Sequence, residues 1–324
     1  MRDRLFTTPP LRVAFLFAAG FSVRGWSFAA AFAVALIAGC ARVPDLGVTA
    51  LKQPNFAALE KYVVGHNTDL EQFRLRGPFT VTTDLGRTIE VSDREHVTGD
   101  LFLAAPAGKA PLVIFMHGYA STKEEHTYQA MHAASWGLHS LAIQLPNTGS
   151  WTTNGRILAR LVSAIRRSPE LVDSRIDPDK IILIGHSFGG TSVAIALAEG
   201  APAAGGILLD PAAVGSDLPA YLRKVRRPVM VLGADEQVSV ARNRDYFFRY
   251  VNAGIGEVSI RGASHEDAQY PSPAGSTSED MQVSFASALT VASISLAATG
   301  QFDYAWTSFG DALRDGKLFD ARKK

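Results

Sequence analysis

Short apolar runs alternate with segments of helical spacing through most of the chain. The predicted strands are 111–116, 140–145, 181–185, 206–209, 229–232 and 258–260, and the predicted helices between or after them are 124–136, 157–165, 193–198 and 285–296. The last of these reads as a long amphipathic helix at the end of the sheet. Strands that alternate with helices require a mostly parallel sheet covered on both faces, so we predict an α/β fold.

The residues before this alternation follow a different pattern. Runs at 79–83 and 100–104 predict two antiparallel opening strands with a polar turn at Asp93-Arg94-Glu95 between them. Residues 40–77 show no strong periodicity apart from one short helix around 56–62. We therefore predict a tether and N-terminal extension over 40–77 and a single α/β domain over 78–324.

The N-terminus is basic and then apolar, as in a secretory signal. An uncharged stretch from Trp26 to Gly39 is too short for a comfortable transmembrane helix but fits the apolar region of a signal peptide. It ends Leu-Ile-Ala-Gly-Cys at Cys40, which resembles the bacterial lipoprotein signal, whose cysteine is lipidated and becomes the new N-terminus. We predict a lipoprotein-type signal peptide over 1–39 and a bacterial cell-envelope protein held at the membrane by a lipid on Cys40. An uncleaved anchor over 11–39 is the alternative.

Charge and cysteine content narrow the classes of partner. Of the 32 basic and 31 acidic residues, the leader holds four arginines and one aspartate, which leaves a net charge of −2 for the rest. A nearly neutral body argues against a nucleic-acid partner. Because Cys40 is the only cysteine, the chain can form no internal disulfide and no multi-cysteine metal site. We predict that it uses no metal and no organic cofactor.

The most informative motif is Gly185-His186-Ser187-Phe188-Gly189, which directly follows the apolar run 181–184. Gly-x-Ser-x-Gly at the end of a buried strand predicts a sharp strand-to-helix turn that presents a serine hydroxyl as a nucleophile. The glycines suit this turn because a Cβ at either position would collide with the neighbouring backbone. Ser187 is therefore the candidate nucleophile.

Together with its surroundings this motif resembles the α/β-hydrolase superfamily, from about Pro78 to the C-terminus. Ile184–Gly190, Leu208-Leu209-Asp210-Pro211 and Ile260–His265 are similar to segments of the platelet-activating-factor acetylhydrolase group. Chlorophyllases share the Leu-Asp-Pro segment, and lid-less cutinase-like esterases share the loop type at His117-Gly118-Tyr119. The resemblance implies an α/β-hydrolase fold, and the short stretch 210–228 leaves no room for an inserted lid domain.

A serine nucleophile needs a base and an acid, which follow it along the chain in this fold. His265 is the only one of the eight histidines that lies beyond the nucleophile motif, so it is the candidate base. Two strand ends offer the acid. Asp210 follows the strand 206–209 and stands where the acetylhydrolase group has its acid, whereas Asp235 and Glu236 follow 229–233. We favour Asp210, with Glu236 as the alternative acid and Asp235 as the third choice.

Backbone amides must hold the oxyanion that forms during attack. The resemblance implies the N–H groups of Phe188, the residue after the nucleophile, and of Tyr119 in the loop after the strand 111–116. His117 is expected to brace that loop. Tyr119, Phe188 and Trp151 are either the lining of an apolar acyl site or packing residues.

The sequence thus predicts a serine hydrolase that cleaves a small-molecule or lipid carboxylic ester through an acyl-enzyme. The same triad would also serve a thioesterase or peptidase. A non-catalytic surface lipoprotein that uses the scaffold for binding is the alternative from outside the enzymes.

Overall fold

A computed structural model describes residues 56–65, 68–105, 108–146, 148, 150–235, 244–272 and 277–324. All of them belong to the second of the chain's two units, residues 42–324. The signal peptide predicted over 1–39, Cys40 and Glu236 lie outside the described residues.

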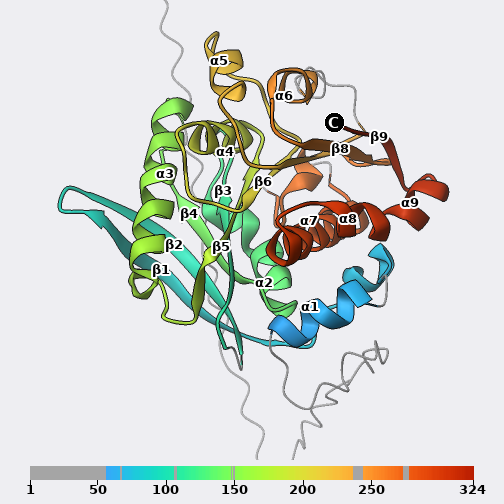
Figure 1. Cartoon of the computed structure of the whole chain (residues 1–324), viewed down its shortest axis with the longest axis horizontal. Coiled ribbons are helices and arrows are strands. Elements are labelled where there is room, and N and C mark those ends of the chain that lie inside the picture. The colour runs from blue at the N-terminus through green and yellow to red at the C-terminus, as the bar shows by residue number, and fades with distance from the viewer. Residues whose placement is uncertain are drawn as a thin grey trace, which may run out of the picture. The chain divides into compact units, whose positions relative to one another are not determined.

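The described residues form one nine-stranded sheet with the order β1-β2-β4-β3-β5-β6-β7-β8-β9 (Figure 1). Strands β3 to β8 are parallel, while β1, β2 and β9 pair in antiparallel fashion at the two sides. The strands are β1 Thr80–Ser92, β2 Glu95–Ala105, β3 Ala110–Met116, β4 His139–Gln144, β5 Ile176–His186, β6 Gly205–Leu209, β7 Val229–Gly233, β8 Ile255–Ile260 and β9 Leu318–Lys323. The predicted mostly parallel α/β sheet is confirmed.

Helices cover both faces of this sheet (Figure 1). The α-helices are α1 Phe56–Gly65, α2 Thr127–Ser135, α3 Trp151–Arg167, α4 Phe188–Ala198, α5 Leu218–Leu222, α6 Arg244–Tyr250, α7 Glu279–Thr299, α8 Asp303–Ser308 and α9 Gly310–Arg314, with short 3-10 turns η2 Leu70–Arg74, η3 Lys123–His126, η4 Pro169–Leu171 and η6 Glu266–Ala268. Alternate residues of one strand enter different cores: Val113 and Phe115 join the core with α1, α2, α7 and α8, whereas Leu112 and Ile114 join the core with α3 and α4. This alternation is why each central strand reads as a continuous apolar run.

The edges of the sheet differ from the sequence prediction. The opening strands run on from Thr80 to Ala105 as one long hairpin around the predicted polar turn. Asp177-Pro178-Asp179 lies inside β5, where the pairing with β3 skips from Ile176 to Ile181 and the residues between them bulge out. Strand β9 was not predicted at all, because its charged, exposed sequence lacks an apolar run.

The prediction of an amphipathic helix at the end of the sheet was wrong for α7. Its residues 285–297 are buried on every side, including the hydroxyls of Ser287 and Ser293, which donate to carbonyls one turn earlier. The helix contacts β5 to β8 on one side and η2, α2 and α8 on the others. It is also the one helix among the described residues that is long and apolar enough to span a membrane, and most of it is buried.

Part of the N-terminal extension packs onto the domain. Leu59 and Val63 of α1 and Phe73 of η2 are fully buried in the same core as α7. Lys180 at the bulge of β5 contacts α1 through an ion pair with Glu60 at 3.4 Å. The described residues between 56 and 77 are therefore a covering layer of the sheet as well as a connection to it.

Candidate active site

Ser187 sits at a strained turn between β5 and α4. Its backbone has φ 53° and ψ −121°, a conformation that residues other than glycine rarely adopt. Its N–H donates to the Leu209 carbonyl at 3.0 Å, and its own carbonyl accepts from Gly190 and Ala212 at 3.0 Å each. These bonds fix the turn from both sides, so that the serine stands at the carboxyl end of the sheet, as predicted.

The glycines around Ser187 are required by close packing. A Cβ at Gly189 would overlap the carbonyls of Met116 and His117, and one at Gly190 would lie 2.8 Å from the Cβ of Pro211. A Cβ at Gly118, in the loop after β3, would lie 3.2 Å from the Cβ of Ser187. The loop that carries Tyr119 is thus in direct contact with the nucleophile turn.

Asp210 follows strand β6 and His265 lies in the loop after β8, and the fold brings their side chains together. Nδ1 of His265 lies 2.6 Å from Oδ2 of Asp210, a short distance typical of a charge-assisted hydrogen bond. Asp210 is fully buried, and its Oδ1 accepts from the Ala234 N–H at 3.1 Å and lies 3.8 Å from Nε of Arg244. A buried carboxylate is stable only with such partners. Sequence reasoning did not find Arg244, which carries no local motif.

The competing acid Asp235 has a different position. Its Oδ2 accepts from the Gly262 N–H at 2.8 Å, and its Oδ1 lies 3.6 Å from the Arg261 guanidinium. Asp235 thus holds the start of the loop that carries His265 and makes no contact with the imidazole itself. Among the described carboxylates the geometry favours Asp210 as the partner of His265.

His186 joins the loop of His265 to the nucleophile turn. Its Nε2 donates to the carbonyl of His265 at 3.1 Å, and the two imidazole rings lie 4.5 Å apart between centroids. Burial lowers the pKa of His186 well below its usual range, and the neighbouring His265 ring acts in the same direction. A neutral ring that donates from Nε2 has an unprotonated Nδ1. Because His186 directly precedes Ser187, this contact places His265 and Ser187 at the same rim of the sheet.

The His265 loop is also held from its other side. Oδ2 of the buried Asp267 accepts from both the N–H and the hydroxyl of Ser264 at 2.8 Å, and Oδ1 accepts from the Ser278 N–H at 2.6 Å. The loop is therefore anchored on each flank of the histidine. Asp267 stands two residues beyond His265, and its anchoring role had no signal in the sequence other than that spacing.

Both predicted oxyanion donors lie next to Ser187: Phe188 follows it in the chain, and Tyr119 follows Gly118, which packs against it. Phe188 is the first residue of α4, so its N–H has no partner within the helix. The Tyr119 N–H makes no hydrogen bond to the residues that the structure describes, and Ala120 after it has φ 54°. The rings of Tyr119 and Trp151 lie 5.8 and 5.2 Å from that of Phe188, and Tyr119 is 58% exposed. These three residues form an aromatic wall beside the serine.

His117 braces the loop before Tyr119. Its Nδ1 lies 2.9 Å from the Gly118 carbonyl, and its Nε2 lies 2.9 Å from the Leu145 carbonyl and 3.1 Å from the Leu145 nitrogen. Burial lowers the pKa of this ring, and the hydrogen bonds to Gly118 and Leu145 act in the opposite direction.

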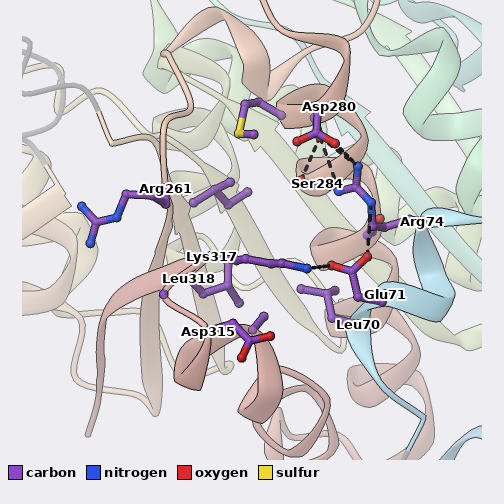
Figure 2. A pocket seen from close by; sticks show the side chains of 14 residues that line it. Leu70, Glu71, Arg74, Arg261, Asp280, Ser284, Asp315, Lys317 and Leu318 are labelled. Carbon is purple, nitrogen blue, oxygen red and sulfur yellow. Dashed lines mark hydrogen bonds and ion pairs between the residues drawn. The ribbon is translucent and has the colours of Figure 1, made fainter.

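A cavity of about 400 Å³ lies elsewhere, between η2, the start of α7 and the start of β9 (Figure 2). Neither Ser187, Asp210 nor His265 lines it. Two ion pairs lie on its rim: Glu71 lies 2.6 Å from Lys317, and Arg74 contacts Asp280 and donates to Ser284 at 2.6 Å. No group of three metal-ligating side chains occurs among the residues that the structure describes.

Comparison with protein families agrees with this geometry. The model of the alpha/beta hydrolase family matches residues 113–315, which include Ser187, Asp210, His265 and both candidate oxyanion donors. A comparison with curated proteins gives no match. The match is to the family as a whole, so the likeness to the acetylhydrolase, chlorophyllase and cutinase-like groups stays a prediction. The matched segment spans most of the parallel sheet, and the chain belongs to the alpha/beta hydrolase family.

Proposed function

We propose that the chain is a serine hydrolase that cleaves carboxylic esters through an acyl-enzyme. The observation that carries the proposal is the 2.6 Å contact between His265 and Asp210. The backbone carbonyl of His265 also accepts a hydrogen bond from His186, the residue before Ser187. A base that is oriented by a buried acid beside a strained serine turn is the arrangement that activates a hydroxyl for acyl transfer.

In the proposed mechanism Ser187 attacks the ester carbonyl while Nε2 of His265 accepts its proton. Because Nδ1 of His265 donates to Asp210, the neutral ring has its lone pair on Nε2 and is the correct tautomer for this step. The amides of Tyr119 and Phe188 stabilise the oxyanion. His265 then gives the proton to the leaving alcohol. In the second half of the reaction His265 takes a proton from water, the water attacks the acyl-enzyme, and His265 returns the proton to Ser187 as the acid product leaves.

The aromatic wall supports an apolar acyl or alcohol group in the substrate. Tyr119, Phe188 and Trp151 lie beside the nucleophile, and Tyr119 is one of few large apolar side chains that are exposed among the described residues. Exposed aromatic surface next to a reactive serine suits a small-molecule or lipid ester.

A fluorophosphonate probe tests the reaction class. The wild-type chain should be labelled on Ser187, and Ser187→Ala should not be labelled. Labelling without hydrolysis of p-nitrophenyl esters from acetyl to long acyl chains would point to a thioesterase or peptidase instead. An unreactive wild-type chain would contradict the proposal and favour a non-catalytic binding protein.

We also propose that Cys40 carries a lipid that holds the protein at the cell envelope. The proposal rests on the leader sequence alone. The wild-type chain should partition into the detergent phase of a phase-separating detergent, and Cys40→Ala should lose that partition if the lipid is the anchor.

A further inference from the structure

The edge of the sheet opposite the candidate active site is rich in exposed cations. Ser187, Asp210 and His265 follow the carboxyl ends of β5, β6 and β8. The opposite edge consists of the residues that precede β7 and β8 and of the chain end after β9, which runs antiparallel to β8. Six exposed side chains lie there, and we call them the basic edge: Arg223, Lys224, Arg226, Arg227, Arg249 and Lys324.

Contacts between its three segments make the basic edge one surface. The Arg223 guanidinium lies 4.8 Å from the centre of the Tyr250 ring, and the Arg223 carbonyl accepts from the Asn252 side chain at 3.1 Å. Nζ of Lys324 donates to the carbonyl of Arg249 at 3.5 Å. Figure 1 shows α5, α6 and the C-terminus, at the end of β9, in the same upper part of the view.

The positive charge of the basic edge is not compensated locally. None of its six side chains forms an ion pair with another described residue. The neighbouring carboxylates Asp245 and Glu257 both contact Arg322, at 2.5 and 2.8 Å. Because the chain without its leader has a net charge of −2, this concentration of cations is a local feature. Clustered like charges repel one another, and an anionic partner would relieve that repulsion.

The aromatic residues among the cations favour a lipid surface over a nucleic acid. Tyr246 is 46% exposed, and Tyr221 and Tyr250 are half-buried. Tyrosines between cations are typical of protein surfaces at the headgroup level of a membrane. The Tyr250 ring lies within 6 Å of both Arg223 and Arg249. These two cations compete for the ring with the bases of a single-stranded nucleic acid, which would bind by stacking on it.

We propose that the basic edge binds the surface of a bilayer that contains anionic phospholipid. Lysine and arginine side chains near such a surface are attracted by its negative potential. The bound orientation turns the edge with Ser187 away from the bilayer, toward the aqueous side. The ester substrate would then come from outside the membrane to which the protein is docked.

Lysine labelling of the full chain on vesicles tests this surface. Phosphatidylcholine vesicles with and without phosphatidylglycerol would be treated with a membrane-impermeant amine-reactive ester, and modification of each lysine measured by mass spectrometry. With phosphatidylglycerol, Lys224 and Lys324 should be protected severalfold, while the exposed Lys317, which lies near the carboxyl end of β8, reacts equally on both vesicles. High salt should remove the protection, because it screens surface charge.

A matched pair of variants gives the second readout. Arg223→Gln, Lys224→Gln, Arg226→Gln and Arg227→Gln together should lower partition onto the anionic vesicles by up to about 600-fold, since each cation near the surface contributes about fivefold. Glutamine at the exposed Arg94, Arg160, Arg314 and Lys317, which lie toward the other end of the sheet, removes the same charge and should have a much smaller effect. Both variants should keep the esterase activity of the wild type, which shows that they fold.

Equal labelling of Lys224 on both vesicles, or equal loss of partition in both variants, would overturn the proposal. Protection by a polynucleotide but not by phosphatidylglycerol would overturn it in favour of a nucleic-acid surface. The labelling does not depend on catalysis, so it can succeed even if the proposed ester hydrolysis fails.

Discussion

Asp210 and His265 stand 55 residues apart along the chain, and their side chains meet at 2.6 Å. The second carboxylate oxygen is held by the Ala234 amide, so the carboxylate cannot rotate away from the imidazole without losing a buried hydrogen bond. A neutral His265 with its proton on Nδ1 is therefore the tautomer that this site selects.

Replacing Asp210 by asparagine should preserve the fold and remove most of the activity. An amide in place of the carboxylate can stabilise the wrong tautomer of His265 and cannot stabilise its cation, so kcat on a p-nitrophenyl ester should fall by about 10⁴-fold. Asp235→Asn is the matched control: its side-chain oxygen can still accept from Gly262, and activity should stay within about tenfold of the wild type. Greater loss in the Asp235 variant would contradict this assignment.

His186 should matter to kcat although it is not expected to touch the substrate. His186→Phe keeps an aromatic ring beside His265 but loses the Nε2 donor to its carbonyl, which frees the loop to move. A shift of about 1 Å in a catalytic group costs about 100-fold, so we expect a loss of that order in kcat with little change in KM. His186→Gln, which can still donate, should recover part of it. A Phe variant that is folded and fully active would show that the contact has no positioning role.

Gly189→Ala should destabilise the fold, because the added methyl would overlap two backbone carbonyls that cannot rotate away. Overpacking of this kind costs about 1–3 kcal/mol, and the rigid neighbours place this site at the upper end. The free energy of unfolding in urea measures it. Gly108→Ala, where nothing lies within 4 Å of the added Cβ, is the control and should leave stability nearly unchanged. Equal stability of the two variants would be inconsistent with the packing described here.

The central sheet was predictable from the sequence because its strands are buried on both faces and read as apolar runs. The same reasoning could not find β9, whose residues Phe319 to Lys323 are half-buried or exposed and lie in a strand only because β8 offers an unpaired edge. It also mistook α7 for an amphipathic helix, since a helix enclosed on all sides keeps small hydroxyl residues that look like a polar face.

The candidate site was predictable where one residue is fixed by a motif or by chain order, as for Ser187 and His265. Asp210 could only be ranked above Glu236 and Asp235, because several strand ends carry acids and the sequence does not say which one faces the imidazole. The contacts that orient the site, from His186, Ala234 and Asp267, depend on loops that meet in three dimensions. Such contacts leave no periodic pattern.

Buried histidines should make the protein lose stability as the pH falls below about 6.5. Burial lowers the pKa of His126, His132 and His139 to about 4 in the folded chain, against about 6.5 when unfolded. Above pH 6.5 both states are neutral and the stability is fully present. Between about 6.5 and 4 the unfolded chain binds protons that the folded chain does not, which lowers the free energy of unfolding by about 2 kcal/mol per histidine at pH 5.

Urea unfolding at pH 7.5 and pH 5 checks this expectation. His132→Gln keeps a donor for the Phe73 carbonyl but cannot titrate, so the difference between the two pH values should shrink by about 2 kcal/mol. The same substitution at the exposed His96 should leave that difference as it is. Burial raises the pKa of Glu125 and of Glu257, and these two carboxyl groups act in the opposite direction. A wild-type chain that is as stable at pH 5 as at pH 7.5 would mean that these histidines are protonated in the folded state, and that the cores around them admit a charge.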